Sequence, residues 1–387
     1  MGWKPEPVVR WQAQRIEDPI QRLRYLQQEM REESYVFPRT GRNRAWFALG
    51  VVLIFPFFLP APRVTSDIST SSAPVQPFPG HERARPESFS DVWLVEDTGG
   101  FETYSNGLRI EKTYSVANQK RFYQVLDRNN GMQPLPEWRS EPVGIVYHTT
   151  ESSLAPFDPD QNETLKHLSH SLVQHLRENR SYNFVIDRFG RVFRVVEETS
   201  AANHSGNSVW ADEQWAYVNL NSSFLGIAFE AQTQSSDGLT PINKAQIHAG
   251  RILTEMLRAK FKIAAKNCVT HAQVSVNPSN MRIGWHTDWA NGFPFAEMGL
   301  ANNYDLPLAS LRDFGFEYDS LFRKAVGPKA WVGLALSEDQ LTRDAIQARR
   351  SPDAYRAELR ERYHHLYSSY KSTGALDEPG DTTNLNR

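Results

Sequence analysis

Hydrophobic and polar residues follow their most regular patterns between residues 141 and 300. A short apolar run that ends in polar residues predicts a buried strand, and leucines three and four residues apart predict a helix. Alternation on both sides of a glycine-containing turn predicts a hairpin. In chain order, these patterns predict a strand at 141–150, a helix at 163–179, a hairpin at 181–196, a strand at 222–232 and a helix at 241–261. Strands mixed with helices predict an α/β fold, with a central mixed β-sheet flanked by helices.

The segments on either side of this central part have different patterns. An uncharged apolar run, preceded by Arg39, Arg42 and Arg44, predicts a single-pass transmembrane signal anchor with the N-terminus in the cytoplasm. A buried core helix or hairpin is the alternative, because the run is short for a membrane span. The predicted division is a cytoplasmic tail at 1–44, the anchor at 45–61, a flexible Ser- and Pro-rich linker at 62–90, a β-rich extension at 91–140, the central domain at 141–300, and a helical C-terminal extension with a polar tail at 301–387.

Charge and cysteine content narrow the possible functions. The formal net charge is −2, and the chain has no basic stripe with interleaved aromatic residues, so we expect no nucleic-acid partner. Cys268 is the only cysteine, which excludes a disulfide within the chain and a zinc site built from several thiolates.

Three histidines and one aspartate stand where a metal site would need them. His148 ends the strand predicted at 141–150, His271 follows a later apolar stretch, and His286 and Asp288 come in the loop after it. Two imidazoles and a carboxylate are the ligands of an open zinc site, which keeps a fourth position for water. A single histidine at the end of a strand is weak evidence, so the prediction depends on the segments between these residues.

Those segments resemble the zinc-dependent N-acetylmuramoyl-L-alanine amidases related to phage amidases and peptidoglycan recognition proteins. The resemblance covers roughly residues 141–296, and its motifs occur in the family's order: GIVYHTT, SYNFVIDRFGRVFRVVE, AANHSGNS, NSSFLGIAFE, LTPINKAQ and THAQ. It implies the α/β fold of that family, with a Zn2+ cofactor in the site.

The resemblance gives His148 and His271 as zinc ligands. The family places an Asp or Cys soon after the second histidine, within Lys-x-Asp-Pro-Gly, and HTDW offers Asp288 there, with His286 in place of the lysine. The loop is longer than usual and has Trp-Ala instead of Pro-Gly, but added loop length costs little entropy. We therefore expect Asp288 as the third ligand and His286 as a catalytic electrophile. The alternative is His286 as the ligand, with Asp288 orienting it.

Other residues are candidates for chemistry or substrate binding. Tyr182 matches the tyrosine near zinc in active phage-type members, where its phenol would hold the attacking water. Glu230 is a candidate general base, although it lies two residues beyond the position of the family's glutamate; a supporting role is the alternative. The candidate substrate contacts are His204, Asn203 and Asn207 in the ANHSGN loop, Arg282 for a peptide carboxylate, and Trp210 and Trp285 as sugar platforms, with core packing as the alternative for the tryptophans.

The resemblance implies hydrolysis of the amide bond between N-acetylmuramic acid and L-alanine, in peptidoglycan or muropeptides. With the predicted anchor, it implies a bacterial inner-membrane protein whose catalytic domain lies in the periplasm. Two alternatives stay open. One is a membrane-anchored module that binds peptidoglycan without hydrolysing it, and the other is a structural protein of the envelope.

Overall fold

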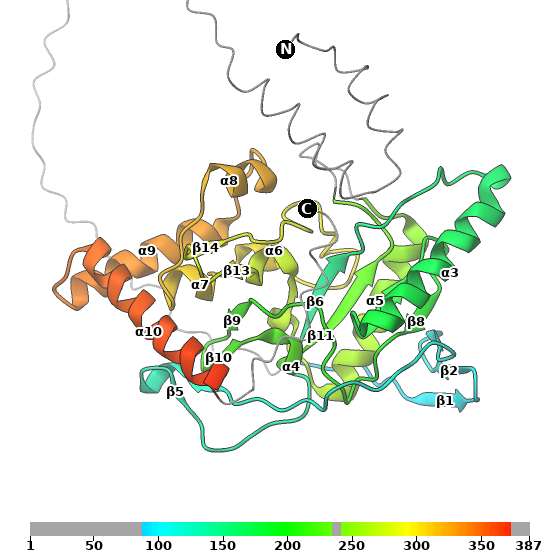
Figure 1. Cartoon of the computed structure of the whole chain (residues 1–387), viewed down its shortest axis with the longest axis horizontal. Helices are drawn as coiled ribbons and strands as arrows, with labels where there is room; N and C mark the ends of the chain where they lie inside the picture. The colour runs from blue at the N-terminus through cyan, green and yellow to red at the C-terminus, as the bar shows by residue number, and fades with distance from the viewer. Residues whose placement is uncertain (1–86, 234–240, 373–387) are drawn as a thin grey trace, which may run out of the picture. The chain divides into compact units, whose positions relative to one another are not determined.

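The computed structural model describes residues 87–233 and 241–372 (Figure 1). The predicted tail at 1–44, the anchor at 45–61 and most of the linker at 62–90 lie outside the described residues. Within the described ranges, no helix is both long and apolar enough to cross a membrane.

A mixed sheet of eight strands forms the centre, in the order β1-β2-β3-β8-β7-β11-β6-β12. Strand β11 runs parallel to β6 and β7, β12 runs parallel to β6, and β7 and β8 form the antiparallel hairpin. The bounds are β6 (Gly144–Thr149), β7 (Phe184–Ile186), β8 (Val192–Arg194), β11 (Phe224–Phe229) and β12 (Cys268–Thr270). The predicted α/β class with a central mixed sheet is confirmed.

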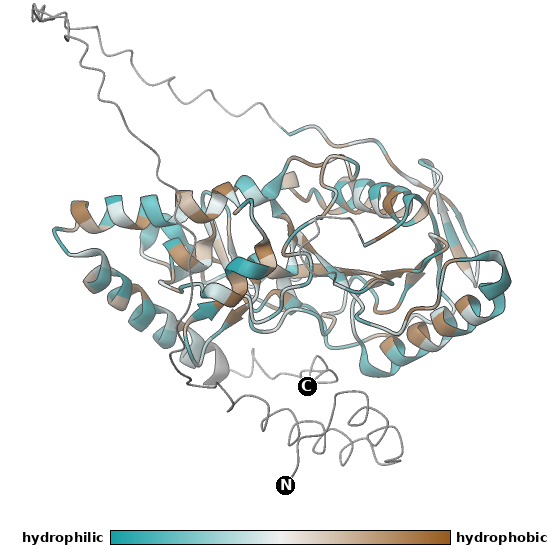
Figure 2. Ribbon diagram, turned by 90° about the horizontal axis from the view of Figure 1, so that it is seen from above, coloured by the Kyte–Doolittle hydropathy of each residue, from teal (hydrophilic) through white to brown (hydrophobic). Residues whose placement is uncertain are grey.

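The two predicted helices cover opposite faces of the sheet. Helix α3 (Asn162–Asn179) packs its apolar side on Val185 and Ala228, whereas α5 (Lys244–Phe261) packs on Ile227 and Phe229. The opposite placement follows from the pleat, because neighbouring residues of a strand point to opposite faces. Figure 2 shows that the helices of the molecule carry both hydrophobic and hydrophilic residues, as packing on one side requires.

The N-terminal extension contributes strands to the same sheet. Strands β1 (Leu94–Asp97), β2 (Phe101–Tyr104) and β3 (Arg109–Glu111) form one edge, and β3 pairs in parallel with β8. Further along, β4 (Leu126–Asp127) and β5 (Gln133–Pro134) join β9 (Val209–Ala211) and β10 (Trp215–Val218) in a smaller sheet. The extension is thus built into the fold by backbone hydrogen bonds.

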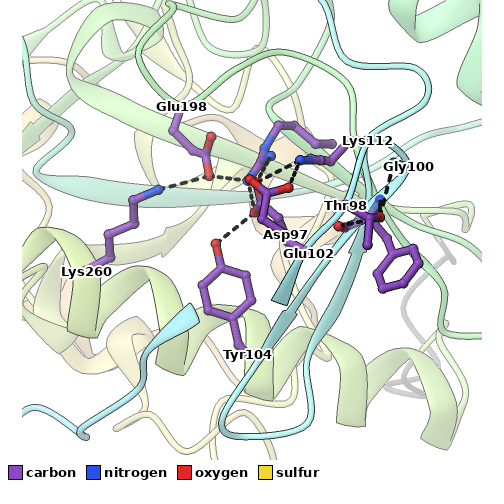
Figure 3. Close-up of polar contacts among 10 residues, drawn as sticks. Asp97, Thr98, Gly100, Glu102, Tyr104, Lys112, Glu198 and Lys260 are labelled. Atoms are coloured by element: carbon purple, nitrogen blue, oxygen red, sulfur yellow. Dashed lines mark hydrogen bonds and ion pairs between the residues drawn. The ribbon is translucent and has the colours of Figure 1, made fainter. Parts of the chain in front are cut away.

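A buried ion-pair network fastens this edge of the large sheet. Arg194 of β8 makes a bidentate pair with Glu102 of β2, at 2.8 and 2.7 Å, and a third contact of 2.9 Å with Glu198. Figure 3 shows how Tyr104, Lys112 and Lys260 complete the network. Because both charges of the Glu102–Arg194 pair are paired and hydrogen-bonded, they can be buried together.

The C-terminal part is helical and shares the core of the sheet. Aromatic residues from this part, including Phe316, Trp331 and Tyr363, belong to the same apolar cluster as Ile145 and Phe229. Its helices are α7 (Ala309–Arg312), α8 (Ser320–Val326), α9 (Val332–Gln347) and α10 (Pro352–Ser372). The shorter elements are α4 (Leu220–Ser223), α6 (His271–Val274), β13 (Val276–Asn277), β14 (Arg282–Ile283), η1 (Arg128–Asn130), η2 (Pro159–Gln161), η3 (Ala265–Asn267) and η4 (Asn303–Asp305).

Candidate metal centre

Sheet topology brings the two predicted histidine ligands together. His148 is the penultimate residue of β6, and His271 begins α6 directly after β12. Since β6 and β12 are neighbouring parallel strands, their carboxyl ends lie side by side. The loop after β14 brings Asp288 to the same place, where its backbone carbonyl accepts a hydrogen bond from the N–H of Ala272 at 3.2 Å.

His148, His271 and Asp288 form a compact set of metal donors. The Nδ1 atom of His271 lies 2.8 Å from Asp288 Oδ1, and the Nδ1 atom of His148 lies 3.3 Å from Asp288 Oδ2. One donor atom from each residue fits within a span of 4.8 Å, and all three residues are buried. Zinc–ligand bonds of about 2.0–2.2 Å in a tetrahedron separate the donors by about 3.3–3.6 Å. The donor types and their spacing therefore fit zinc.

The protonation states also suit a metal. Burial, together with the neighbouring His271, lowers the pKa of His148 to about 4. Burial by itself would raise the pKa of Asp288, but the neighbouring His271, together with the polar contacts to His148 and His271, holds it well below its usual range. A neutral imidazole and an ionised carboxylate are the forms that bind metal ions.

Hydrogen bonds on the side of the His148 ring opposite Asp288 determine which of its nitrogens carries the proton. The carbonyl oxygen of Phe224 can only accept, so His204 Nε2 donates to it at 3.3 Å and His204 Nδ1 is left as an acceptor. His148 Nε2 then donates to His204 Nδ1 at 3.1 Å. This assignment, made from the hydrogen-bond network, leaves the lone pair of His148 Nδ1 directed at the candidate metal position.

The comparison with known families agrees with this geometry. Residues 138–290 match the family described as N-acetylmuramoyl-L-alanine amidase, a segment that contains all three donors. This segment is an N-acetylmuramoyl-L-alanine amidase domain. No curated protein sequence matches the chain.

Several solved structures resemble the amidase domain at low sequence identity. AmpDh3 from Pseudomonas aeruginosa, in complex with anhydromuramic pentapeptide, is 22% identical over 45% of this chain and 64% of that one, with a TM-score of 0.31. AmiD from E. coli, with anhydro-N-acetylmuramic acid-L-Ala-D-γ-Glu-L-Lys, is 20% identical over the same shares, also with a TM-score of 0.31. Drosophila peptidoglycan recognition protein SD is 19% identical over 35% of this chain and 71% of that one, with a TM-score of 0.25.

The two bacterial structures are matched over less than two thirds of their length. The TM-scores of these matches are all below 0.5.

His286 lies beside the donors of the amidase domain but outside their group. Its ring stacks on that of His271, with the centroids 4.7 Å apart and an interplanar angle of 15°. Among the described residues, the three-donor group consists of His148, His271 and Asp288. The geometry therefore favours Asp288 over His286 as the third ligand. Trp285, whose accessible fraction is 38%, meets His286 edge-on at the surface.

Tyr182 lies beside His148. The two ring centroids are 4.9 Å apart, and burial together with the charge of Asp288 raises the pKa of the phenol. The backbone of Tyr182 has a φ of 57°, which is unfavourable for an aromatic residue and often accompanies a functional position. The phenol is therefore a proton-bearing group close to the metal position.

The hydrogen-bond partners of Glu230 lie outside the group of metal donors. Its carboxylate accepts from Ser169 Oγ of α3 at 2.6 Å and from the backbone N–H of Arg188 in the hairpin turn at 3.1 Å. Burial raises the pKa of this carboxyl, and the two hydrogen bonds oppose that rise. It shares a strand face with Ala228, but it is not a member of the donor group, so its role as a base stays a prediction.

Two predicted substrate contacts need correction. Trp210 is buried in the core, with its indole N–H donating to Asn267 Oδ1 at 3.1 Å, so it cannot serve as a sugar platform. His204 is also buried, and it lies behind His148 rather than on the cleft surface. In both cases the side chain turns inward because a buried hydrogen-bond partner is available there.

The remaining predicted contacts have structural partners of their own. Asn203 donates its amide to the carbonyl of Asn179, and Asn207 accepts a 3.4 Å hydrogen bond from a hydroxyl of α10. Arg282 forms an ion pair with Asp319 at 3.0 Å while keeping about half of its side chain exposed. Contacts of these residues with a substrate stay predictions.

Three residues that support the centre are not among the predicted site residues. Arg121, a buried guanidinium from the extension, donates to the same Phe224 carbonyl at 2.8 Å and to Asn183 Oδ1 at 3.1 Å. Asn183 lies in the SYNF motif, and its amide also bonds the backbone of the loop that follows the hairpin. A Cβ on Gly226 would come within 2.7 Å of the His204 ring, so only glycine gives this ring its place. The motifs point to Asn183 and Gly226, but nothing points to Arg121.

Proposed function

We propose that this chain is a zinc-dependent N-acetylmuramoyl-L-alanine amidase that hydrolyses peptidoglycan or muropeptides. The observation that carries the proposal is the buried donor group of His148, His271 and Asp288 within the segment that matches the amidase family.

His148 Nδ1, His271 Nδ1 and one carboxylate oxygen of Asp288 would hold the zinc ion. Bound there, zinc supplies a Lewis acid that polarises the amide carbonyl and lowers the pKa of water toward about 7. The chain keeps His148 neutral and Asp288 ionised, so neither residue has to change its protonation state to bind the metal.

Tyr182 and His286 lie next to this position and would contact the substrate. With its raised pKa, Tyr182 keeps its hydroxyl proton and donates a hydrogen bond to the attacking water or the carbonyl oxygen. His286, stacked on His271, takes the place of the family's lysine and stabilises the negative charge that develops on the carbonyl oxygen. The exposed Trp285 offers an aromatic surface for a sugar ring at the rim.

The test uses the full chain and N-acetylmuramoyl-L-Ala-D-γ-Glu-L-Lys. Mass spectrometry should find free tripeptide and N-acetylmuramic acid, with activity lost after chelation and restored by added zinc. Asp288→Ala should be inactive, whereas His167→Ala, a change at an exposed histidine of α3, should be active. If the substrate binds but remains uncut with zinc present, the chain is instead a recognition module.

The cellular location is a separate proposal. The predicted anchor at 45–61 would hold the amidase domain on the periplasmic side of the inner membrane, next to its substrate. The full chain should then sediment with membranes, and a chain that begins at residue 62 should be found in the soluble fraction. Recovery of both chains in the soluble fraction would rule out the anchor.

A further inference from the structure

The loop that carries Asp288 has an unusual conformation. Trp289, the next residue, is buried and has a φ of 59°. Left-handed backbone at a bulky residue is unfavourable, and it persists only where the surrounding structure holds it. Something outside the loop must therefore fix the backbone at this position.

Two aromatic residues of the C-terminal part donate hydrogen bonds to backbone carbonyl groups of the loop. Tyr304 Oη donates to the carbonyl oxygen of Trp289 at 2.5 Å, and Trp331 Nε1 donates to that of Ala290 at 2.9 Å. Both donors are buried, and their rings stack with centroids 4.8 Å apart. The carbonyls of the two residues that follow Asp288 are thus bound by one rigid pair of rings.

Close packing alone does not hold the loop here. A cavity of about 490 Å³ lies beside it, lined by Asn291 and Gly292 of the loop and by Tyr304 and Trp331. On this side the loop faces the cavity and not a filled core. Hydrogen bonds therefore contribute more than close packing to holding the loop in place there. A third hydrogen bond, from Asn291 Nδ2 to the carbonyl of Ala325 in α8, also holds the loop in place.

The same segment also holds the helix that begins at His271. Gln273 of α6 donates to the carbonyl of Asn303 at 2.8 Å, and Asn303 Nδ2 donates to the carbonyl of Cys268 in β12 at 2.7 Å. Residues 303–331 therefore contact both the strand that leads to His271 and the loop of Asp288.

We infer that the C-terminal extension completes the metal site, with Tyr304 and Trp331 as positioning residues for Asp288. This inference rests on the proposed function, since it assumes that Asp288 binds zinc. The mechanism is preorganisation: each carboxylate oxygen of Asp288 meets a different histidine, so a small shift of the loop would spoil both contacts.

The test compares Tyr304→Phe and Trp331→Phe with Tyr123→Phe in the full chain. Tyr123 is a matched control, because it is also a buried tyrosine that donates to a backbone carbonyl, that of Glu141, but in the N-terminal extension. Three readouts are needed: zinc affinity by competition with a chromophoric chelator, the visible spectrum of the cobalt-substituted protein, and unfolding of the metal-free protein.

We expect Tyr304→Phe and Trp331→Phe each to weaken zinc binding by about tenfold or more, and to alter the cobalt spectrum. Tyr123→Phe should change neither readout, even where it lowers stability as much. Zinc affinity and cobalt spectra equal to those of the unmodified chain would overturn this inference alone. An unmodified chain that binds no zinc would overturn the proposed function and this inference together.

Discussion

The hydrogen bond between His148 Nε2 and His204 Nδ1 shows how one side chain can set the chemistry of another. His204 is itself fixed by the carbonyl of Phe224, which can only accept. A metal ligand is improved when its remote nitrogen is held in this way, because the tautomer and the ring orientation are both fixed. His204 therefore supports the metal centre through its contact with His148.

Replacing His204 should weaken metal binding in a way that depends on the new side chain. We expect His204→Ala to lower zinc affinity by about 10–100-fold. His204→Asn should lose less, because an asparagine oxygen can take the position of Nδ1 and accept from His148. Zinc titration by competition measures both variants. Equal losses in the two variants would show that the volume of the ring matters, and not its hydrogen bond.

Replacing Tyr182 should affect the hydrolysis rate and not the zinc affinity. Its phenol lies beside His148 and is not one of the three proposed zinc ligands, so Tyr182→Phe should leave zinc affinity unchanged. We expect the hydrolysis rate at saturating substrate to fall by about 100-fold, as is typical when one donor to a developing charge is removed. Steady-state kinetics of the zinc-loaded chain give this rate. A change in KM alone would place Tyr182 in substrate binding instead.

At the scale of elements, the edge strands depend on buried charge. Arg194 joins β8 to Glu102 of β2, and the network in Figure 3 surrounds this pair. Burial would raise the pKa of Glu102, but the hydrogen bonds and charge of Arg194, with smaller effects from Tyr104 and Lys112, lower it to about 2. A carboxyl whose pKa is lowered on folding stabilises the fold above its unfolded pKa, and that stabilisation is lost as pH falls through the folded pKa.

Glu102→Gln should therefore destabilise the protein in a pH-dependent manner. At pH 7 we expect a loss of up to about 3 kcal/mol in the free energy of unfolding, from a pKa difference of about 2.5 units. The loss should shrink as pH falls from 4.5 toward 2, where Glu102 becomes neutral like glutamine. Urea unfolding across this range tests it, with Glu96→Gln on the exposed face of β1 as the control. A difference that stays constant with pH would contradict the assignment.

At the scale of the whole chain, the sequence predicts local motifs better than it predicts contacts between residues that are distant in sequence. The strand ending at His148, the hairpin and the segment at His271 are short patterns, and the structure forms each where it is predicted. The choice between Asp288 and His286 depends on the path of a long loop, which no periodicity describes.

The errors have the same physical origin. Trp210 and His204 turn inward because their partners, Asn267 and the Phe224 carbonyl, are distant in sequence and invisible to a local pattern. Tyr304 and Trp331 lie beyond the segment that resembles the amidases, so no motif draws attention to them. Their contacts with the Asp288 loop exist only in the folded chain.

The zinc content of the purified full chain and two variants tests the central claim most directly. After dialysis to remove loosely bound metal, we predict one zinc ion per chain for the unmodified protein and for His286→Ala, and none for Asp288→Ala. His286 stacks beside the donor group without joining it, whereas Asp288 contacts both histidine ligands. An unmodified chain without zinc, or zinc that is lost with His286 and kept without Asp288, would contradict the account.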